Sequence, residues 1–230
     1  MITNERGLTE EQIMMRDACR AFVNDFVTPF IRKNWQREWD MTPENRLSVL
    51  LRNILPKHLK DYWFPRIVAD PTFLLSHCLT EPRGASDRWL PYDVPEAMMQ
   101  TRAVKKGDRW VINGRKQFIS NGYDSKLYVV YATTTPGAGM TKGTSNFLVP
   151  RGTKGFTIAR CNETLGGRYM NNGELVFEDC EVPEDHMLVQ DTALTKAGIY
   201  FRPGKIIQSS KNLGIGVAAF EKTAEYVQNY

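Results

Sequence analysis

The chain has 230 residues, 42% of them apolar and 24% charged, a globular composition that argues against a disordered chain. The net charge is only +4, and Lys and Arg alternate with Asp and Glu along the sequence, so we expect no nucleic-acid-binding face. No apolar run approaches the roughly 18 residues of a membrane-spanning helix. Four widely spaced cysteines and the lack of a signal-peptide pattern predict free thiols in a cytoplasmic protein.

The first 70 residues carry helical patterns. Apolar residues recur every three to four positions over residues 8–27, which predicts an amphipathic helix. Further helices are expected over 43–55 and 56–67. Residues 1–70 are therefore predicted to form a helical N-terminal domain.

After residue 70, short β-prone runs alternate with Gly-, Pro- and Asn-rich turns, one of them predicted at Asn113-Gly114. The predicted strands are 73–79, 101–104, 110–112, 127–132, 146–149, 156–159 and 175–177. No helical pattern lies between them to connect parallel strands, so we expect an antiparallel sandwich or barrel over 71–190. An apolar stripe at helical spacing in 191–230 predicts the start of a C-terminal helical domain, which makes the fold α+β.

Two segments combine the ends of β-prone runs with small polar residues, from Leu79 to Asp87 and from Gln117 to Gly122. Such strand ends present backbone N–H groups and short hydroxyls, which can bind a polar, planar ligand. Each hydroxyl alone is also typical of a turn, and an aromatic ring alone is typical of a core. Together they indicate a cofactor site built from His77, Thr80, Ser86, Phe118 and Ser120.

Other candidate chemistry is weaker. Glu81 and Asp87 could form a pair of catalytic carboxylates, but backbone capping is favoured, because the sequence shows no environment that raises a pKa. The three histidines are isolated from one another and from the cysteines, so no metal site is expected.

The same segments resemble the acyl-CoA dehydrogenase family of flavoproteins. Leu79-Thr80-Glu81-Pro82, followed by Ser86-Asp87, is similar to the family's TEP…GSD segment, and Trp110 to Gly122 is similar to its NG.K.WIT/SNG segment. Shorter similarities follow in the family's order, among them Phe147-Leu148-Val149, Glu174-Leu175-Val176-Phe177 and Val182-Pro183. The resemblance covers nearly the whole chain.

The resemblance implies a helical N-terminal domain, a β-barrel middle domain and a C-terminal helical bundle, with FAD between the barrel and the bundles. It implies flavin contacts from His77, Leu79, Thr80, Phe118 and Ser120. Ala85 and Ser86 are implied to meet a flavin phosphate or the pantetheine of the substrate. Lys205, where a helix Arg often stands, is a further implied substrate contact. Ala85 replaces a family Gly, and Phe118 replaces the usual Trp.

The implied activity is α,β-dehydrogenation of an acyl-CoA thioester to the 2,3-enoyl-CoA, with FAD as hydride acceptor and an electron-transfer flavoprotein as electron acceptor. Relative to the family, helices are missing near residues 50–56 and beyond Tyr230, where the catalytic Glu usually lies. We therefore assign no catalytic base, and we expect a homo-oligomer or a hetero-oligomer with a subunit that supplies the missing helices. A catalytically silent flavin-binding or scaffold subunit, and a flavin monooxygenase, are the alternatives.

Overall fold

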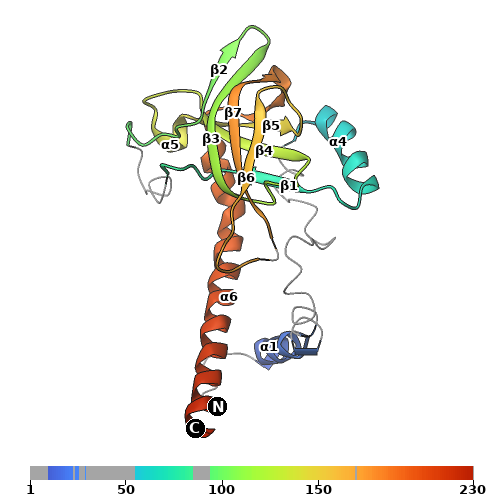
Figure 1. The fold of residues 1–230 in the computed structure, drawn as a ribbon, viewed down its shortest axis with the longest axis vertical. Coiled ribbons are helices and arrows are strands. Elements are labelled where there is room, and N and C mark those ends of the chain that lie inside the picture. Colours follow the sequence, from blue (N-terminus) through green and yellow to red (C-terminus); the bar gives the residue numbers. More distant parts are fainter. Residues whose placement is uncertain are drawn as a thin grey trace. The chain divides into compact units, whose positions relative to one another are not determined.

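The computed structural model describes residues 10–22, 24–25, 29, 55–84, 94–168 and 170–229, except for the side chains of 11, 12, 199–208 and 210. Two compact units divide the chain. One comprises Met1–Arg37 and Arg202–Tyr230, and the other comprises Glu38–Phe201. The second unit contains the β-sheet (Figure 1). The three domains expected over 1–70, 71–190 and 191–230 stay a prediction.

One sheet joins the strands of the described residues, in the order β6-β7-β3-β2-β4-β5-β8, with β1 paired to β4 beside this path. The α+β class is therefore confirmed. The expected closed barrel is wrong, because the sheet is open and ends at β6 and β8. The strands are β1 (Leu75–Cys78), β2 (Arg102–Lys106), β3 (Arg109–Ser120), β4 (Leu127–Thr133), β5 (Thr144–Pro150), β6 (Phe156–Cys161), β7 (Asn172–Pro183) and β8 (Met187–Val189).

The sheet is also not wholly antiparallel. β1 pairs in parallel with β4, with Leu75 opposite Leu127, and β2 meets the same strand in parallel where Arg102 lies opposite Thr133. The expectation of purely antiparallel pairing overlooked that a crossover need not be a helix. Here the β2–β3 hairpin lies in the chain between β1 and β4 and provides the long connection that a parallel pair requires.

Both faces of β4 are covered, and all seven of its residues are buried. Alternate residues enter two hydrophobic clusters. Leu127, Val129 and Tyr131 belong to one cluster, and Tyr128 and Val130 belong to the other. Burial on both faces explains why this strand has a continuous apolar sequence.

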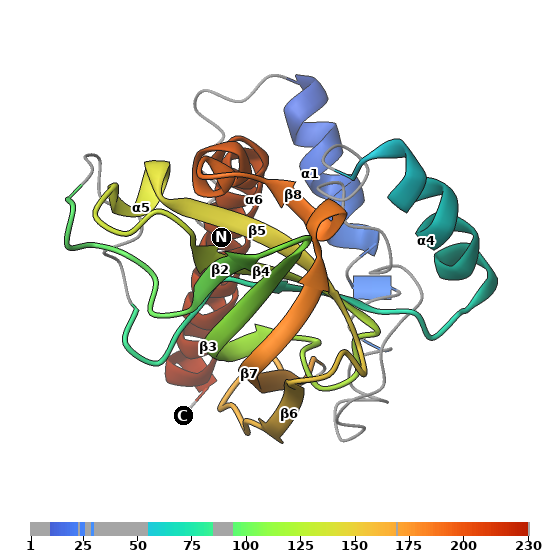
Figure 2. The same cartoon turned by 90° about the horizontal axis from the view of Figure 1, so that it is seen from above.

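Helices pack onto the first of these clusters. α4 (Lys57–Ala69) buries Leu59 and Ile67 there, and α6 (Ala193–Asn229) buries Ala193, Leu194 and Ala197 in its first turns. Figure 2 shows α4 beside the sheet, seen from above. α1 (Glu10–Phe22) confirms the first predicted helix, whereas the helix predicted over 43–55 lies outside the described residues. The remaining elements are α5 (Gly139–Lys142) and the 3₁₀ turn η4 (Glu184–His186).

The predicted turn at Asn113-Gly114 is wrong, because β3 continues through both residues. Gly114 has φ +146°, and a Cβ there would lie 2.5 Å from Cα of Thr101. Glycine is needed at this position because the backbone of Thr101 passes against it. The pairing of β3 with β7 shifts register at the same point.

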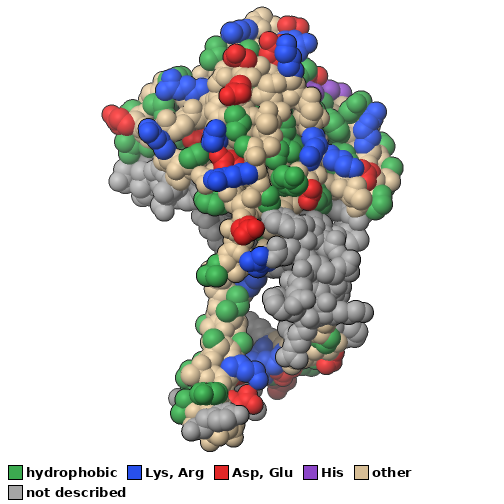
Figure 3. Space-filling model, in the orientation of Figure 1, with side chains coloured by type: hydrophobic (Ala, Val, Ile, Leu, Met, Phe, Trp, Pro, Cys, Tyr) green, Lys and Arg blue, Asp and Glu red, His purple; other side chains and the backbone are tan. Residues whose placement is uncertain are grey.

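Charged side chains are spread over the surface. On the face in Figure 3, Lys and Arg side chains are interspersed with Asp and Glu side chains over the sheet. No helix in the described part of the chain has the length and apolarity to cross a membrane.

Candidate functional site

The segment that follows β1 lies beside the second half of β3. The carbonyl oxygen of Thr80 accepts a hydrogen bond from the backbone N–H of Gln117 at 2.9 Å. Nζ of Lys116 donates to the carbonyl oxygen of Leu79 at 3.3 Å. After β1, which pairs with β4, the chain thus crosses to β3. The two segments that the sequence analysis singled out therefore meet in the fold.

Phe118 projects from a β-bulge in β3. Between Lys116 and Ile119 this strand advances by three residues while β7 advances by two, from Leu175 to Gly173. Phe118 has φ +56°, which is a strained conformation for a bulky residue, and the residue is 54% exposed. The extra residue in β3 changes which side chains face outward, so the bulge directs the Phe118 ring to the surface.

Ser120 ends β3 in a tightly held turn. Its side chain is exposed, and its carbonyl oxygen accepts a hydrogen bond from the buried hydroxyl of Ser76 at 2.8 Å. Two residues later, the carbonyl oxygen of Gly122 accepts from the hydroxyl of Tyr128 at 3.1 Å. A Cβ on Gly122 would lie 2.8 Å from the carbonyl oxygen of Ile119, so glycine allows this turn to close. The position of Ser120 is therefore fixed by the backbone.

His77 contacts a buried tyrosine. Its Nε2 lies 3.1 Å from the hydroxyl oxygen of Tyr131, and the two ring centroids are 5.0 Å apart. Burial lowers the pKa of His77 to about 4, which keeps the imidazole neutral near pH 7. Burial raises the pKa of Tyr131, although a hydrogen bond with the Asn146 side chain opposes that shift. Oδ1 of Asn146 is buried and has no hydrogen-bond partner among the described residues.

Glu81 and Lys116 form a buried ion pair. Oε1 of Glu81 lies 2.8 Å from Nζ of Lys116, and the two side chains are 4% and 0% exposed. The carboxylate also accepts backbone hydrogen bonds from Gln100 at 2.6 Å and Thr101 at 2.9 Å. Burial opposes ionisation of Glu81, but the charge of Lys116 and these hydrogen bonds hold its pKa below the ordinary value. The expected backbone-capping role of Glu81 is confirmed.

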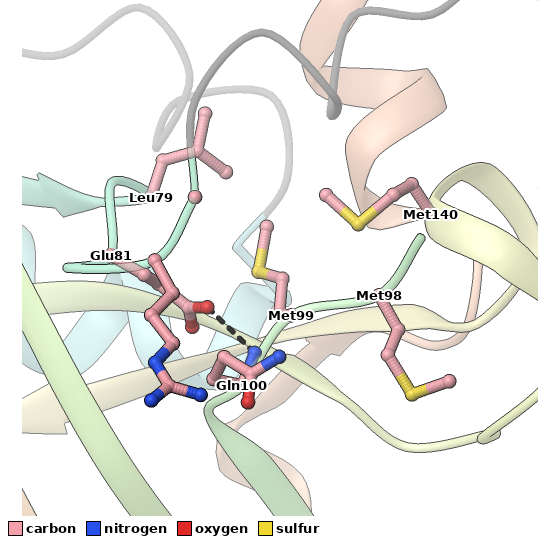
Figure 4. A pocket seen from close by; sticks show the side chains of 8 residues that line it. Leu79, Glu81, Met98, Met99, Gln100 and Met140 are labelled. Carbon is pink, nitrogen blue, oxygen red and sulfur yellow. Dashed lines mark hydrogen bonds between the residues drawn. The ribbon is translucent and has the colours of Figure 1, made fainter. Parts of the chain in front are cut away.

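A small pocket opens beside Glu81 (Figure 4). Three methionines, Met98, Met99 and Met140, contribute to its wall, and Met140 comes from α5. The remaining lining residues are Leu79, Glu81, Arg83, Gly84 and Gln100. The carboxylate of Glu81 points toward the backbone of Gln100 in Figure 4, as their hydrogen bond requires. The pocket therefore borders the segment that follows β1.

Lys116, Tyr131 and the pocket methionines were not predicted from the sequence to belong to the site. The burial of Lys116 could have been predicted, because Lys116 stands an even number of positions from the buried residues Trp110 and Ile112. Its side chain therefore shares their face of β3. No comparable sequence signal marks Tyr131 or the methionines.

Some predicted site residues cannot be placed. Ala85 and Ser86 lie outside the described residues, as does the side chain of Lys205. His77, Leu79, Thr80, Phe118 and Ser120 are described. Leu79 and Thr80 accept hydrogen bonds from Lys116 and Gln117, the two residues before Phe118, whereas His77 lies against Tyr131. Within the described part of the chain, no group of three His, Cys, Asp or Glu residues could hold a metal ion.

Comparison with known proteins gives consistent matches. Residues 76–180 match the family described as acyl-CoA dehydrogenase, middle domain. Cyclohex-1-ene-1-carbonyl-CoA dehydrogenase of Syntrophus aciditrophicus is 34% identical over 175 residues, which cover 74% of this chain and 39% of that protein. The chain thus spans about two fifths of the length of this curated relative.

Two solved structures share the fold. Butyryl-CoA dehydrogenase from Megasphaera elsdenii is 29% identical with a TM-score of 0.55, covering 63% of this chain and 36% of that one. A glutaryl-CoA dehydrogenase from Mycobacterium smegmatis in complex with FADH2 is also 29% identical, with a TM-score of 0.51, covering 63% of this chain and 34% of that one.

Proposed function

Because this chain belongs to the acyl-CoA dehydrogenase family through its middle domain at residues 76–180, we propose that it binds FAD and acts in the α,β-dehydrogenation of an acyl-CoA thioester to the 2,3-enoyl-CoA. The observation that carries the proposal is the hydrogen bond from Gln117 to Thr80. It brings the proposed flavin contacts after β1 next to Phe118 on β3.

The chemistry of this junction fits a flavin. An isoalloxazine ring has two flat apolar faces and a polar edge, and it requires both an aromatic or apolar surface and hydrogen-bonding groups. Phe118 supplies an exposed aromatic ring. The segment from Leu79 to Thr80 supplies backbone groups and a hydroxyl. The buried charges beside them, Glu81 and Lys116, neutralise each other.

Each residue has a proposed role. His77, Leu79 and Thr80 hold the polar edge of the flavin, Phe118 packs on its ring, and Ser120 hydrogen-bonds near its reactive nitrogen. When bound, FAD supplies the acceptor for the hydride that leaves the β-carbon of the substrate. The hydrogen-bond donors of the chain favour negative charge at that edge because they are held in place before the reaction. Neutral His77 can serve there without adding a charge.

The other proposed contacts bind the remaining parts of the cofactor and the substrate. Ala85 and Ser86 meet a flavin phosphate or the pantetheine of the substrate, and Lys205 contacts the substrate. We assign no catalytic base to this chain. An electron-transfer flavoprotein or a similar acceptor takes up the electrons, and the protein associates as a homo-oligomer or a hetero-oligomer.

The proposal is tested by titrating the purified chain with FAD and following flavin fluorescence. We expect saturable binding, and we expect Thr80→Val and Phe118→Ala to weaken it about tenfold, which is the effect of losing one good contact. Thr153→Val is the matched control, because the Thr153 hydroxyl donates to the carbonyl of Pro150 in a turn between β5 and β6. Affinities unchanged by Thr80→Val and Phe118→Ala would contradict the assigned site.

The reaction itself is tested by adding acyl-CoA thioesters of different chain lengths to the FAD-loaded protein without oxygen. Bleaching of the oxidised flavin absorbance, with the 2,3-enoyl-CoA as product, is the expected result. FAD binding with no bleaching by any thioester would favour the catalytically silent subunit instead. Oxygen consumption by the reduced flavin would point to the monooxygenase.

A further inference from the structure

We infer that the buried ion pair of Glu81 and Lys116 positions the proposed flavin-binding segment against β3. This inference rests on the proposed function and extends it to two residues that need not touch the cofactor. Their role is to set where Leu79 and Thr80 lie relative to Phe118.

The contacts of the pair carry the argument. Lys116 holds this segment at two points, since its Nζ donates to the carbonyl oxygen of Leu79 and to the carboxylate of Glu81. Thr80 lies between these two points, and its own carbonyl oxygen accepts from Gln117. Three consecutive residues after β1 are therefore attached to two consecutive residues of β3.

Glu81 extends the connection to a third segment. Its carboxylate accepts from the backbone N–H groups of Gln100 and Thr101, just before β2. One carboxylate thus joins the segment after β1, the entry to β2 and the second half of β3 (Figure 4 shows the bond to Gln100). Each of these strands has its own ladder partners elsewhere in the sheet, but the segment after β1 is outside any ladder.

Stability alone does not explain why the pair is charged. Burying two charges costs desolvation energy that their mutual attraction offsets only in part, and apolar side chains of similar size often serve stability equally well. A charged pair with a full set of hydrogen bonds selects one register instead, because any displacement leaves buried charges without partners. In this chain the selected register is that of Thr80 beside Gln117.

A direct catalytic role for Glu81 is disfavoured by the same geometry. A general base must present a free lone pair to its substrate, whereas the carboxylate of Glu81 accepts three hydrogen bonds and is almost fully buried. Its lowered pKa also makes it a weak base. Positioning is the role that remains.

The test replaces both charges together, as Glu81→Gln with Lys116→Met, since either change alone leaves a buried charge that can prevent folding. The first readout is amide hydrogen exchange at Gln117, which donates to Thr80, relative to Arg151, which donates to the carbonyl of Lys126 in another part of the sheet. We expect the protection of Gln117 to fall at least about tenfold relative to that of Arg151, as local opening becomes easier. Unchanged relative protection would overturn the inference.

The second readout is the FAD dissociation constant, for which we expect a rise of about tenfold in the double variant. Glu174→Gln is the matched control, because Glu174 is a nearly buried carboxylate on the same sheet that pairs with Arg115 at 2.6 Å and Arg160 at 2.5 Å. The control should leave Gln117 protection and FAD affinity unchanged.

The two readouts separate the possible failures. Wild-type protein that binds no FAD would refute the proposed function, while the exchange at Gln117 would still decide whether the pair holds the segment. Lower protection with unchanged FAD affinity would show that the pair orders the segment without affecting the site, which overturns its role in positioning flavin contacts.

Discussion

The hydroxyl oxygen of Tyr131 lies 3.1 Å from Nε2 of His77, and the parallel pairing of β1 with β4 brings these two residues together. His77 is thereby held in a half-buried position, where desolvation lowers its pKa to about 4. The contact joins a residue of the proposed flavin site to the middle of the core, so it affects both pH dependence and stability.

His77 is expected to make the protein less stable in mild acid. Its folded-state pKa of about 4 lies below the ordinary value of 6.5, so between these values the unfolded chain binds a proton that the folded protein does not. The free energy of unfolding should therefore fall as the pH is lowered through this window, by at most about 1.4 kcal/mol per pH unit from this group. His77→Phe should reduce that slope in urea denaturation measured from pH 7 to pH 4. An identical slope in the variant would contradict the assignment.

Tyr131→Phe is expected to lower the free energy of unfolding by about 1–3 kcal/mol, because the hydroxyl that is lost is buried and contacts two polar side chains. These are His77 and Asn146. Tyr62→Phe is the control, since the Tyr62 side chain is 50% exposed and should change stability by less than about 0.5 kcal/mol. Equal effects of the two substitutions in urea denaturation would argue against the buried network.

Phe118→Gly is expected to separate stability from binding. A bulky residue at φ +56° carries about 1–2 kcal/mol of strain that glycine removes, while the greater freedom of glycine in the unfolded chain offsets about 0.5–1 kcal/mol of the gain. The protein without FAD should therefore become slightly more stable to urea. FAD affinity should fall about tenfold because the exposed ring is lost. A loss of stability would show that Phe118 is held by packing instead.

Gly114→Ala is expected to cost more than about 2 kcal/mol, because the new Cβ would lie 2.5 Å from the backbone of Thr101 and the residue has φ +146°. Gly166→Ala is the matched control, as a Cβ there would meet no atom within 4 Å. The comparison requires only thermal unfolding of the two variants. A mild effect at Gly114 would mean that the hairpin can shift away from Thr101.

Local patterns predicted most of the described elements, including α1, α4, α6 and the cores of strands β1 to β7, but not β8. They did so because apolar residues recur every two positions in a strand and about every 3.6 positions in a helix with one buried face. They did not predict the order in which the strands pair. Strand order depends on which ladders form between distant segments, and the parallel pairing of β1 with β4 depends on the intervening hairpin.

The partner of Lys116 is likewise not predictable from local sequence patterns. Its parity in β3 predicts an inward-facing side chain, but a lysine is buried only where a partner compensates its charge. That partner, Glu81, is 35 positions away in the chain. Sequence alone therefore indicated that Glu81 caps backbone groups, and the fold was needed to pair it with Lys116.

The sequence by itself determined the α+β class, the family resemblance and the two segments proposed to hold the flavin, since each is recorded in local residue order. The tertiary structure decided how those segments meet. A bulge between Lys116 and Ile119 directs Phe118 outward, and a buried ion pair holds Thr80 beside Gln117. Both features depend on backbone register between strands, which is a property of long-range pairing and is absent from any local pattern.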